Sequence, residues 1–240
     1  MPRFFLEDIA GEQAHIQGDD ARHITKSLRM REGEELTLCD TKGTDYRCSI
    51  ETLDYEEVTV RVLEHSPSRS EVSCRIRLYQ ALPKGEKLEF IVQKATELGA
   101  DEIVPVVTAR CISRPLMRSM EKKRERLQKI AYEAAKQSGR GKIPRILPMV
   151  SFSEALEGMK QAELPLLFYE ESDNPLHTIL QGEPASISLM VGSEGGFTAK
   201  EAEDAQQAGI HLASLGSRIL RCETAPVCAL SAILYFLGEI

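Results

Sequence analysis

Hydrophobic and polar residues alternate along the first part of the chain in the manner of short β-strands. Val58, Val60 and Val62 are separated by polar residues, which is the two-residue period of a strand with one buried face. One helical stretch, residues 19–28, interrupts this pattern. Residues 1–70 are therefore predicted to form a small β-rich domain, closed or nearly closed into a barrel.

The pattern changes after a polar segment at residues 66–70, which contains Pro67 and is the best candidate for a linker. Over residues 71–240, apolar runs of strand length alternate with helical stretches, which predicts an α/β domain whose parallel sheet is covered on both faces. The predicted strands are 76–81, 103–107, 164–169, 187–191 and 211–215. The predicted helices lie near 86–98, 118–138, 152–161, 199–208 and 224–237. Ligands of such sheets bind beyond the carboxyl ends of the strands, so the loops that begin after residues 169, 191 and 215 are the candidate site.

A glycine-rich loop, residues 192–198 (GSEGGFT), follows one predicted strand. Thr198 and Glu201 have the spacing of a capping box, so a helix is expected to begin there. A loop between a strand and a helix start presents backbone N–H groups to a ligand. Its glycines lack the spacing of nucleotide-binding fingerprints, and Glu194 would repel a polyphosphate. A neutral or cationic ligand is favoured, and a glycine-rich turn without a ligand is the alternative interpretation.

A second candidate loop lies in residues 215–226 (LGSRILRCETAP). Arg218 and Arg221 flank two apolar residues, which are expected to pack against something, either a ligand or the body of the protein. Thr224 is the predicted N-cap of the last helix, with Pro226 in its first turn, where the missing N–H of proline has no cost.

Charge is distributed unevenly along a chain whose net charge is −7. Residues 110–145 hold twelve Lys and Arg against three acids, whereas residues 146–204 hold eleven acids against two Lys. The basic region is interpreted either as a contact for RNA phosphates or as a solvated helix face with i,i+4 ion pairs.

Composition argues against a metal-binding, a membrane-spanning and a secreted protein. The six cysteines are scattered, with no CxxC or Cys/His cluster, so free thiols in a reducing compartment are expected and a metal site is not. No window approaches the roughly 20 apolar residues of a membrane span, and the N-terminus reaches charged residues too soon for a signal peptide. A cytoplasmic protein without a metal is predicted.

Five motifs occur in order along the whole chain. They are RHxxxxLR at 22–29, KxxxxExxxxKATELG at 84–99, QSGR at 137–140, EGGFT at 194–198 and LGxRILRxETAP at 215–226. Together they resemble the ribosomal RNA small subunit methyltransferase E family of the SPOUT class. The resemblance implies methylation of N3 of a specific uridine in 16S ribosomal RNA, with S-adenosyl-L-methionine as cofactor. It implies a PUA-like, RNA-binding β-barrel at 1–70 and a SPOUT domain with a C-terminal deep trefoil knot at 71–240.

The implied partners are 16S ribosomal RNA, or the small ribosomal subunit, and a second copy of the chain in a homodimer. Two other functions stay under consideration. One is a tRNA methyltransferase of the same class. The other is a non-catalytic RNA-binding factor in ribosome assembly, which would not need the two candidate loops together.

The resemblance also implies the site residues. The expected cofactor contacts are Leu167, Phe168, Glu170, Gly192, Glu194, Gly195, Gly196, Leu215, Gly216, Ile219, Leu220, Thr224 and Ala225. Basic residues of the early helical stretch and of the later helices are the expected RNA contacts, namely Arg22, His23, Lys26, Arg29, Lys94, Arg114, Arg118, Lys122, Lys136 and Arg140.

Methylation of N3 requires loss of the N3 proton, which leaves negative charge on the flanking carbonyl oxygens. Arg221 is predicted to stabilise that charge as a preorganised donor. Glu223 is interpreted either as the proton acceptor, if burial raises its pKa, or as a first-turn acid that complements the helix dipole. The family commonly has proline at the position of Ser193 and threonine at that of Cys222. We expect Cys222 to be a small packing residue, because N3 is itself a nucleophile and needs no covalent activation of the ring.

Overall fold

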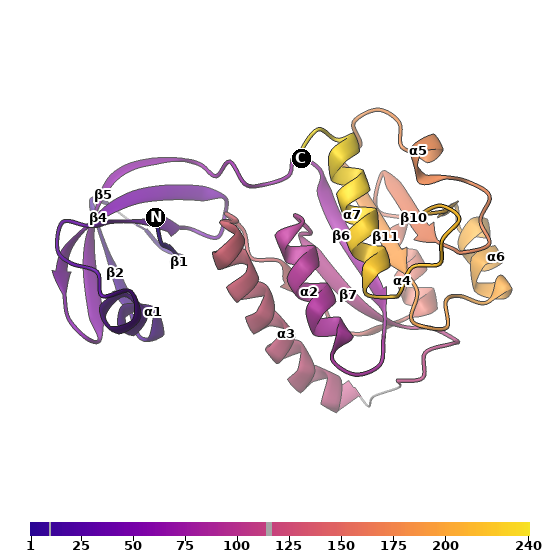
Figure 1. Cartoon of the computed structure of the whole chain (residues 1–240), viewed down its shortest axis with the longest axis horizontal. Helices are drawn as coiled ribbons and strands as arrows, with labels where there is room; N and C mark the ends of the chain where they lie inside the picture. The colour runs from indigo at the N-terminus through magenta and orange to yellow at the C-terminus, as the bar shows by residue number, and fades with distance from the viewer. Residues whose placement is uncertain (10, 114–116) are drawn as a thin grey trace. The chain divides into compact units, whose positions relative to one another are not determined.

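The structure, a computed structural model, describes residues 1–9, 11–113 and 117–240 and divides into two compact units. Unit 1 comprises Met1–Glu71 and Ala135–Ile143, and unit 2 comprises Val72–Ala134 and Pro144–Ile240. Figure 1 labels their helices and strands. The sequence had placed everything after residue 70 in the second domain. Residues 135–143 belong instead to the first unit, through contacts that a local pattern does not reveal.

Unit 1 is built on one mixed five-stranded sheet in the order β1-β3-β4-β5-β2, in which β1 runs parallel to β3 and the other neighbours are antiparallel. Among the described residues no ladder joins the edge strands β1 and β2, so strand pairing leaves the sheet open rather than closing it into a barrel. The strands are β1 (Arg3–Phe5), β2 (Gln13–Gln17), β3 (Glu35–Cys39), β4 (Thr44–Leu53) and β5 (Glu57–Pro67).

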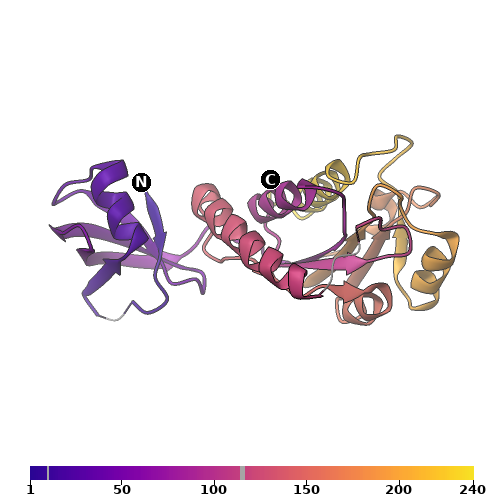
Figure 2. The same cartoon turned by 90° about the horizontal axis from the view of Figure 1, so that it is seen from below.

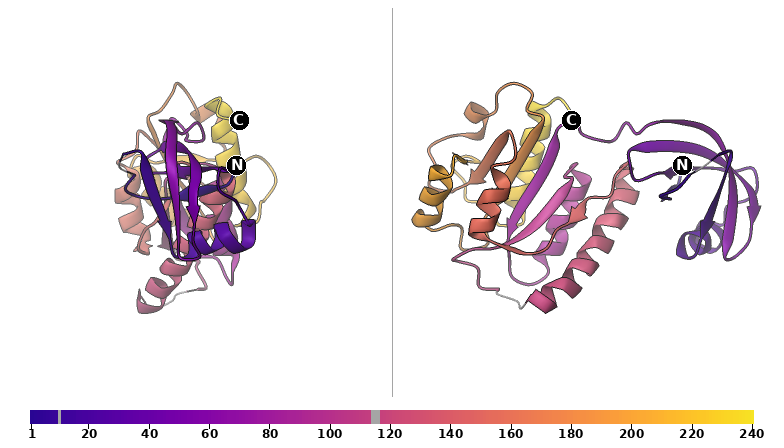
Figure 3. Two further views of the ribbon diagram at one scale, coloured as in Figure 1. Left: turned by 90° about the vertical axis from the view of Figure 1, so that its left-hand side faces the viewer. Right: turned by 180° about the vertical axis from the view of Figure 1, so that it is seen from behind.

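The predicted helical stretch of unit 1 is confirmed as α1 (Asp19–Arg22), which continues as a π-helical turn, η1 (His23–Leu28). It covers one face of the sheet (Figure 3), where Ala21 and Ile24 are fully buried among the apolar side chains of the strands. Arg29, with a φ of 51°, ends the stretch in the left-handed conformation.

Residues 135–143 join unit 1 through buried and half-buried polar contacts. Nη2 of Arg140 lies 2.7 Å from Oε2 of Glu71, and this carboxylate also accepts a 2.7 Å hydrogen bond from the Gly141 N–H. Lys136 Nζ lies 2.6 Å from Asp20 Oδ1 and 4.2 Å from the centre of the Phe4 ring. Because Arg140 is only 2% exposed, its guanidinium does not lie open to a phosphate, which corrects the expectation that it contacts RNA.

Unit 2 contains a seven-stranded sheet in the order β12-β10-β11-β6-β7-β8, with β9 also paired to β7. Every ladder is parallel, as the apolar runs predicted. The strands are β6 (Arg75–Ala81), β7 (Glu102–Val107), β8 (Arg145–Ile146), β9 (Val150–Ser151), β10 (Leu164–Phe168), β11 (Ser186–Val191) and β12 (His211–Ala213).

Helices cover both faces of this sheet (Figure 2). One apolar cluster joins one face to α2 (Lys87–Glu97), α3 (Met117–Ser138), α5 (Leu176–Ile179) and α7 (Thr224–Phe236). The other cluster joins the opposite face to α4 (Phe152–Met159) and α6 (Ala199–Gln207). The short elements β8, β9 and α5 were not predicted, because two to four residues show no clear period.

The neighbouring strands β10, β11 and β12 place the candidate loops together. Phe168, the last residue of β10, pairs with Val191 at the end of β11 and with Ala213 at the end of β12. The three following loops therefore leave the sheet side by side at one edge. The fold thus confirms that the carboxyl ends of these strands meet, as expected for the ligand edge of a parallel sheet.

Candidate active site

A pocket of about 350 Å³ lies at this edge, entirely within unit 2. Its walls are the end of β10, the glycine loop (residues 192–198) and the Arg221 loop (residues 215–223), with the start of α7. The lining residues are Phe168, Tyr169, Glu170, Val191, Gly192, Ser193, Glu194, Gly195, Gly196, Ala213, Ser214, Leu215, Gly216, Ser217, Arg218, Ile219, Leu220, Cys222 and Ala225.

The glycine loop has no room for side chains where it passes the pocket wall. Gly196 has a φ of +62°, and a Cβ there would overlap the carboxylate of Glu170. A Cβ at Gly195 would lie 2.9 Å from the Cβ of Arg110, and one at Gly192 would lie 3.0 Å from the Cα of Gly196. The glycines therefore serve close packing of backbone against neighbouring groups, and Gly196 also supplies a conformation that other residues rarely adopt.

The segment after β7 holds this loop in place. Arg110 donates a 3.0 Å hydrogen bond to the carbonyl oxygen of Gly195, and the N–H of Ala109 donates a 2.7 Å hydrogen bond to Glu201. Glu201 also completes the predicted capping box with Thr198. The segment after β7 thus fixes the middle of the loop at Gly195 and, through Glu201, the start of the capped helix α6.

Polar groups in the pocket suit a ligand that carries positive charge. The carboxylates of Glu170 and Glu194 line the cavity, and Ser193 Oγ is a buried side-chain oxygen without a hydrogen-bond partner among the described residues. An unpartnered buried hydroxyl is costly unless a ligand or water completes it. Among the described residues no lysine lines the cavity, and the one arginine that does is the exposed Arg218. The donor set therefore does not resemble a polyphosphate site.

Glu194 does not act alone, because two groups from the motif at residues 84–99 bind it. Lys87 Nζ lies 2.9 Å from its Oε1, and the Lys84 N–H donates to the same oxygen at 3.1 Å. Burial raises the pKa of Glu194, but the hydrogen bonds from Lys87 and from backbone N–H groups outweigh it and hold the pKa below its usual value. The carboxylate is ionised at neutral pH, with much of its charge compensated by Lys87.

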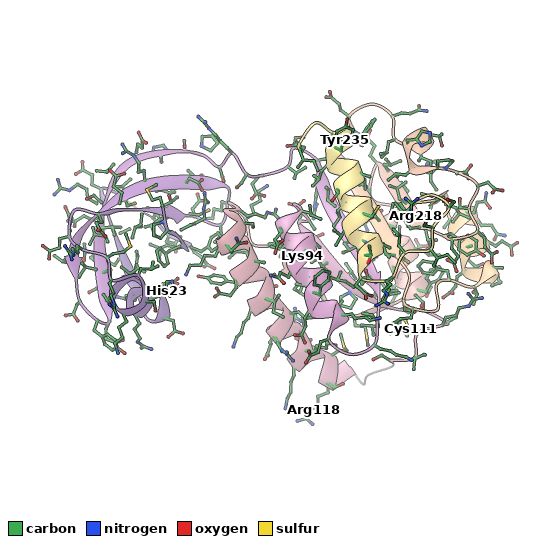
Figure 4. All side chains as sticks on the ribbon, in the orientation of Figure 1. His23, Lys94, Cys111, Arg118, Arg218 and Tyr235 are labelled. Atoms are coloured by element: carbon green, nitrogen blue, oxygen red, sulfur yellow. The ribbon has the colours of Figure 1, made fainter. Side chains whose placement is uncertain are left out.

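The Arg221 loop contributes the apolar side of the cavity. Leu215, Leu220 and Ala225 line it, together with Ile219, whose side chain is 88% exposed. Together these four side chains form an apolar patch beside an open cavity, and such a patch marks a surface that a ligand can cover. Figure 4 labels Arg218 in the same loop, where it also lines the pocket.

The two catalytic candidates lie beside the pocket rather than in its wall. Arg221 is exposed, and its backbone oxygen accepts the N–H groups of Thr224 and Ala225. Glu223 is half-buried, accepts a 3.2 Å hydrogen bond from the Cys222 thiol and lies 3.4 Å from Lys87 Nζ. The Cys222 thiol, the Glu223 N–H and Lys87 together lower the pKa of Glu223, so the condition set for a general base, a raised pKa, is not met.

Glu223 also takes the position predicted for Thr224. It is the N-cap of α7, without a side-chain capping bond, and Thr224 is the first helical residue. The N-cap prediction for Thr224 is therefore wrong. Pro226 lies in the first turn as expected.

Of the expected cofactor residues, Leu167 and Thr224 alone do not line the pocket. Leu167 is fully buried in the cluster beneath α4 and α6, because successive strand residues point to opposite faces. Eight lining residues were not predicted. Seven of them directly adjoin predicted positions, namely Tyr169, Val191, Ser193, Ser214, Ser217, Arg218 and Cys222. The eighth, Ala213, is the last residue of β12 and lies two residues before the predicted Leu215.

The expected RNA contacts fall in several places. His23, Lys26 and Arg29 are exposed on the helical stretch of unit 1, and Lys26 lies 4.3 Å from the centre of the Tyr55 ring. Arg22 is half-buried and pairs with Asp19 and Glu56.

In unit 2, Arg118 (Figure 4) and Lys122 are exposed on the first turns of α3, and Lys94 on α2 pairs with Glu97. Lys136 and Arg140 lie in unit 1, as described above. Arg114 lies outside the described residues.

Two family models match the chain. The RNA methyltransferase domain matches residues 70–234, and the RNA methyltransferase PUA domain matches residues 16–63. The parallel sheet with its glycine-lined pocket and the preceding small β-sheet unit thus have the architecture of an RNA methyltransferase with a PUA domain.

Comparison with individual proteins shows which family of RNA methyltransferases the chain resembles. The chain is 36% identical to ribosomal RNA small subunit methyltransferase E of Bacillus subtilis (strain 168), over 98% of this chain and 96% of that protein. A crystal structure of a ribosomal RNA small subunit methyltransferase E from Neisseria gonorrhoeae, bound to S-adenosyl methionine, superposes with a TM-score of 0.88 at 32% identity, covering 98% and 97% of the two chains. A Legionella pneumophila methyltransferase structure with bound S-adenosyl methionine gives a TM-score of 0.86 at 30% identity, covering 97% and 96%. The chain belongs to the ribosomal RNA small subunit methyltransferase E family.

The described part of the chain contains no helix that is long and apolar enough to cross a membrane. Within the same residues, no three or more His, Cys, Asp or Glu side chains come together as a metal site would require.

Proposed function

We propose that this chain transfers a methyl group from S-adenosyl-L-methionine to N3 of one uridine in 16S ribosomal RNA. The observation that carries the proposal is the pocket between the glycine loop and the Arg221 loop, in a chain whose relatives of 30% identity or more bind S-adenosyl methionine in their solved structures.

The pocket fits the chemistry of that cofactor. S-adenosyl-L-methionine has no phosphate, and it carries positive charge at its sulfonium and amino groups. Glu170 complements that charge, and Glu194 adds the part of its charge that Lys87 leaves uncompensated. The apolar side of the Arg221 loop suits the adenine ring. When bound, the cofactor supplies an activated methyl group, and the protein's part is to orient it, to exclude water and to support the charge on the uracil ring.

Arg221 is the proposed donor to the uracil carbonyl oxygens. Its side chain is exposed, and its neighbours Leu220 and Cys222 line the pocket, so we place it within reach of a base that enters from solvent. A positioned guanidinium lowers the cost of removing the N3 proton by stabilising the resulting anion. Glu223 is ionised at neutral pH, but its lowered pKa makes it a weak base. We therefore assign the main catalytic contribution to Arg221.

RNA binding is proposed for the exposed basic residues outside the pocket. His23, Lys26 and Arg29 in unit 1, together with Arg118 and Lys122 in unit 2, lie open to phosphates. Arg140 is left out because it is buried against Glu71. The net charge of −7 does not oppose this function, because the cations are concentrated locally.

The proposal includes the SPOUT deep trefoil knot in the C-terminal segment, a homodimer and a cytoplasmic location. In support of a dimer, α7 exposes Tyr235 at 77% and Phe236 at 39%, an apolar surface that a second copy would cover. Light scattering of the purified chain tests the dimer directly.

The experiment that tests the activity maps methylated uridines in RNA from cells with and without this gene. Loss of one 3-methyluridine in 16S ribosomal RNA is the expected result. Loss of a methyl group from tRNA would assign the other substrate. No loss from any RNA, with no rise in melting temperature on adding S-adenosyl-L-methionine, would leave a non-catalytic RNA-binding factor.

A further inference from the structure

Lys87, the first residue of α2, lies between two loops that belong to distant parts of the sequence. Its Nζ is 2.9 Å from Glu194 in the glycine loop and 3.4 Å from Glu223 in the Arg221 loop. It also lies 3.8 Å from the sulfur of Cys222. One ammonium group thus contacts both walls of the pocket.

The surroundings of Lys87 form a small charged cluster. The titratable groups that affect the pKa of Lys87 are Glu194, Glu223 and Cys222, and the Lys84 N–H adds a fixed donor on Glu194. The hydrogen bond to Glu194 is the main reason that the pKa of Lys87 is raised, to about 12. The lysine is therefore a permanent cation between two carboxylates, not a proton acceptor.

We propose that Lys87 is a positioning residue that holds the glycine loop and the Arg221 loop at a fixed separation, and so sets the width of the cofactor pocket. Glu194 and Glu223 are its two anchors, and the three residues are called the Lys87 bridge below. The proposal rests on the proposed function, because it takes S-adenosyl-L-methionine as the ligand of this pocket.

The Lys87 bridge joins a helix that is fixed in the core, α2, to a loop that is largely exposed, the Arg221 loop. Helix α2 is fixed in the core by Leu88 and Ile91, both fully buried. The Arg221 loop is largely exposed, and its second residue, Gly216, has a φ of +99°. Without Lys87, Glu194 and Glu223 would face one another as like charges, which favours movement of the loop away from the pocket.

Calorimetric titration with S-adenosyl-L-methionine tests the bridge without relying on turnover. We expect Lys87→Met to weaken the affinity by about tenfold, which corresponds to the loss of two partly exposed ion pairs. Lys87→Arg keeps the charge and should restore most of the affinity. Lys160→Met removes another ion pair of unit 2, between Lys160 and Glu157 on α4, and should leave the affinity unchanged. Thermal unfolding of each variant separates loss of the site from loss of the fold.

The pH dependence of binding distinguishes the bridge from a general loss of packing. In the unchanged chain Lys87 helps to lower the pKa of Glu194 and of Glu223, so both remain ionised well below neutral pH. In Lys87→Met these pKa values rise, so protonation of a carboxylate as the pH drops from 7 to about 5 relieves the repulsion between Glu194 and Glu223, and part of the lost affinity should return. The affinity of the unchanged chain should stay nearly constant over that range.

Three outcomes are distinguishable. A tenfold loss of affinity at pH 7 that becomes smaller toward pH 5 in Lys87→Met, together with recovery in Lys87→Arg, supports the bridge. Unchanged affinity and an unchanged pH profile in Lys87→Met overturn it, while leaving the proposed function intact. Failure of the unchanged chain to bind S-adenosyl-L-methionine contradicts the proposed function itself.

Discussion

The carboxylate of Glu170 occupies the space that a side chain on Gly196 would need. The two residues come from the loops after neighbouring parallel strands, β10 and β11, and Gly196 holds a φ of +62°. The carboxylate of Glu170 and the backbone of the glycine loop, which has no side chain at Gly196, therefore form the same pocket wall. The wall is therefore sensitive to the smallest possible change at residue 196.

Gly196→Ala is expected to reduce affinity for S-adenosyl-L-methionine by tenfold or more, because the new methyl group displaces Glu170 or the loop. Gly182→Ala is the matched control: Gly182 has a similar φ of +64°, but nothing lies within 4 Å of its Cβ position. Both variants should lose about 1 kcal/mol of folding free energy from the left-handed backbone. Calorimetry that finds equal cofactor affinity in the two variants would contradict the assignment of the glycine loop to the pocket.

Arg221→Lys should lower the rate of methyl transfer by about a hundredfold, because lysine keeps the charge but loses the planar fork of donors. Its affinity for the cofactor should change little, since Arg221 does not line the pocket. Arg218→Lys is the comparison variant: because Arg218 lines the pocket, we expect this substitution to change the cofactor affinity more than Arg221→Lys does. Single-turnover methylation and calorimetry measure the two effects. A normal rate in Arg221→Lys would remove Arg221 from the mechanism.

Cys222→Thr should leave the methylation rate within about twofold. Burial raises the pKa of the Cys222 thiol to about 12, and the hydrogen bond to Glu223 adds to the increase. Because the thiolate forms only as the pH approaches that value, almost none is present at pH 7 to 9. Alkylation with iodoacetamide at pH 8 should modify the exposed Cys228 and spare Cys222. A dead Cys222→Thr variant would favour a covalent mechanism instead.

Arg140→Met should destabilise unit 1 by about 3 kcal/mol, because it leaves the Glu71 carboxylate buried without its cation. Arg118→Met, at an exposed position on α3, is the control and should change stability little. Urea unfolding followed by circular dichroism measures both. If Arg140→Met were as stable as the unchanged chain and bound RNA more weakly, the original interpretation of Arg140 as an RNA contact would be correct.

The sequence predicted those features of the fold that depend on local pattern. Continuous apolar runs gave the parallel strands of unit 2, and the spacing of Thr198 and Glu201 gave the start of α6. The glycine loop and the Arg221 loop were also visible, because their unusual residues directly follow strands. The meeting of these loops followed from the general property that parallel strands end at one edge.

Relationships across long sequence separations were not visible. Arg140 and Glu71 are 69 residues apart in the sequence, so the attachment of residues 135–143 to unit 1 has no local signal. The same holds for Lys87. Its local sequence is that of an ordinary helix residue, and only the fold brings it beside Glu194 and Glu223. Leu167 was misplaced because a run of apolar residues does not tell which face of a fully buried strand each residue occupies.

The most direct test of the proposed activity is methylation in vitro with labelled S-adenosyl-L-methionine. The substrates are small ribosomal subunits and naked 16S ribosomal RNA from cells that lack this gene, followed by mass spectrometry of the nucleosides. We predict one labelled methyl group per RNA, recovered as 3-methyluridine from a single position, with strongly reduced transfer by Gly196→Ala and normal transfer by Gly182→Ala. Label on another atom of uridine, on another nucleoside, or on tRNA alone would contradict the account.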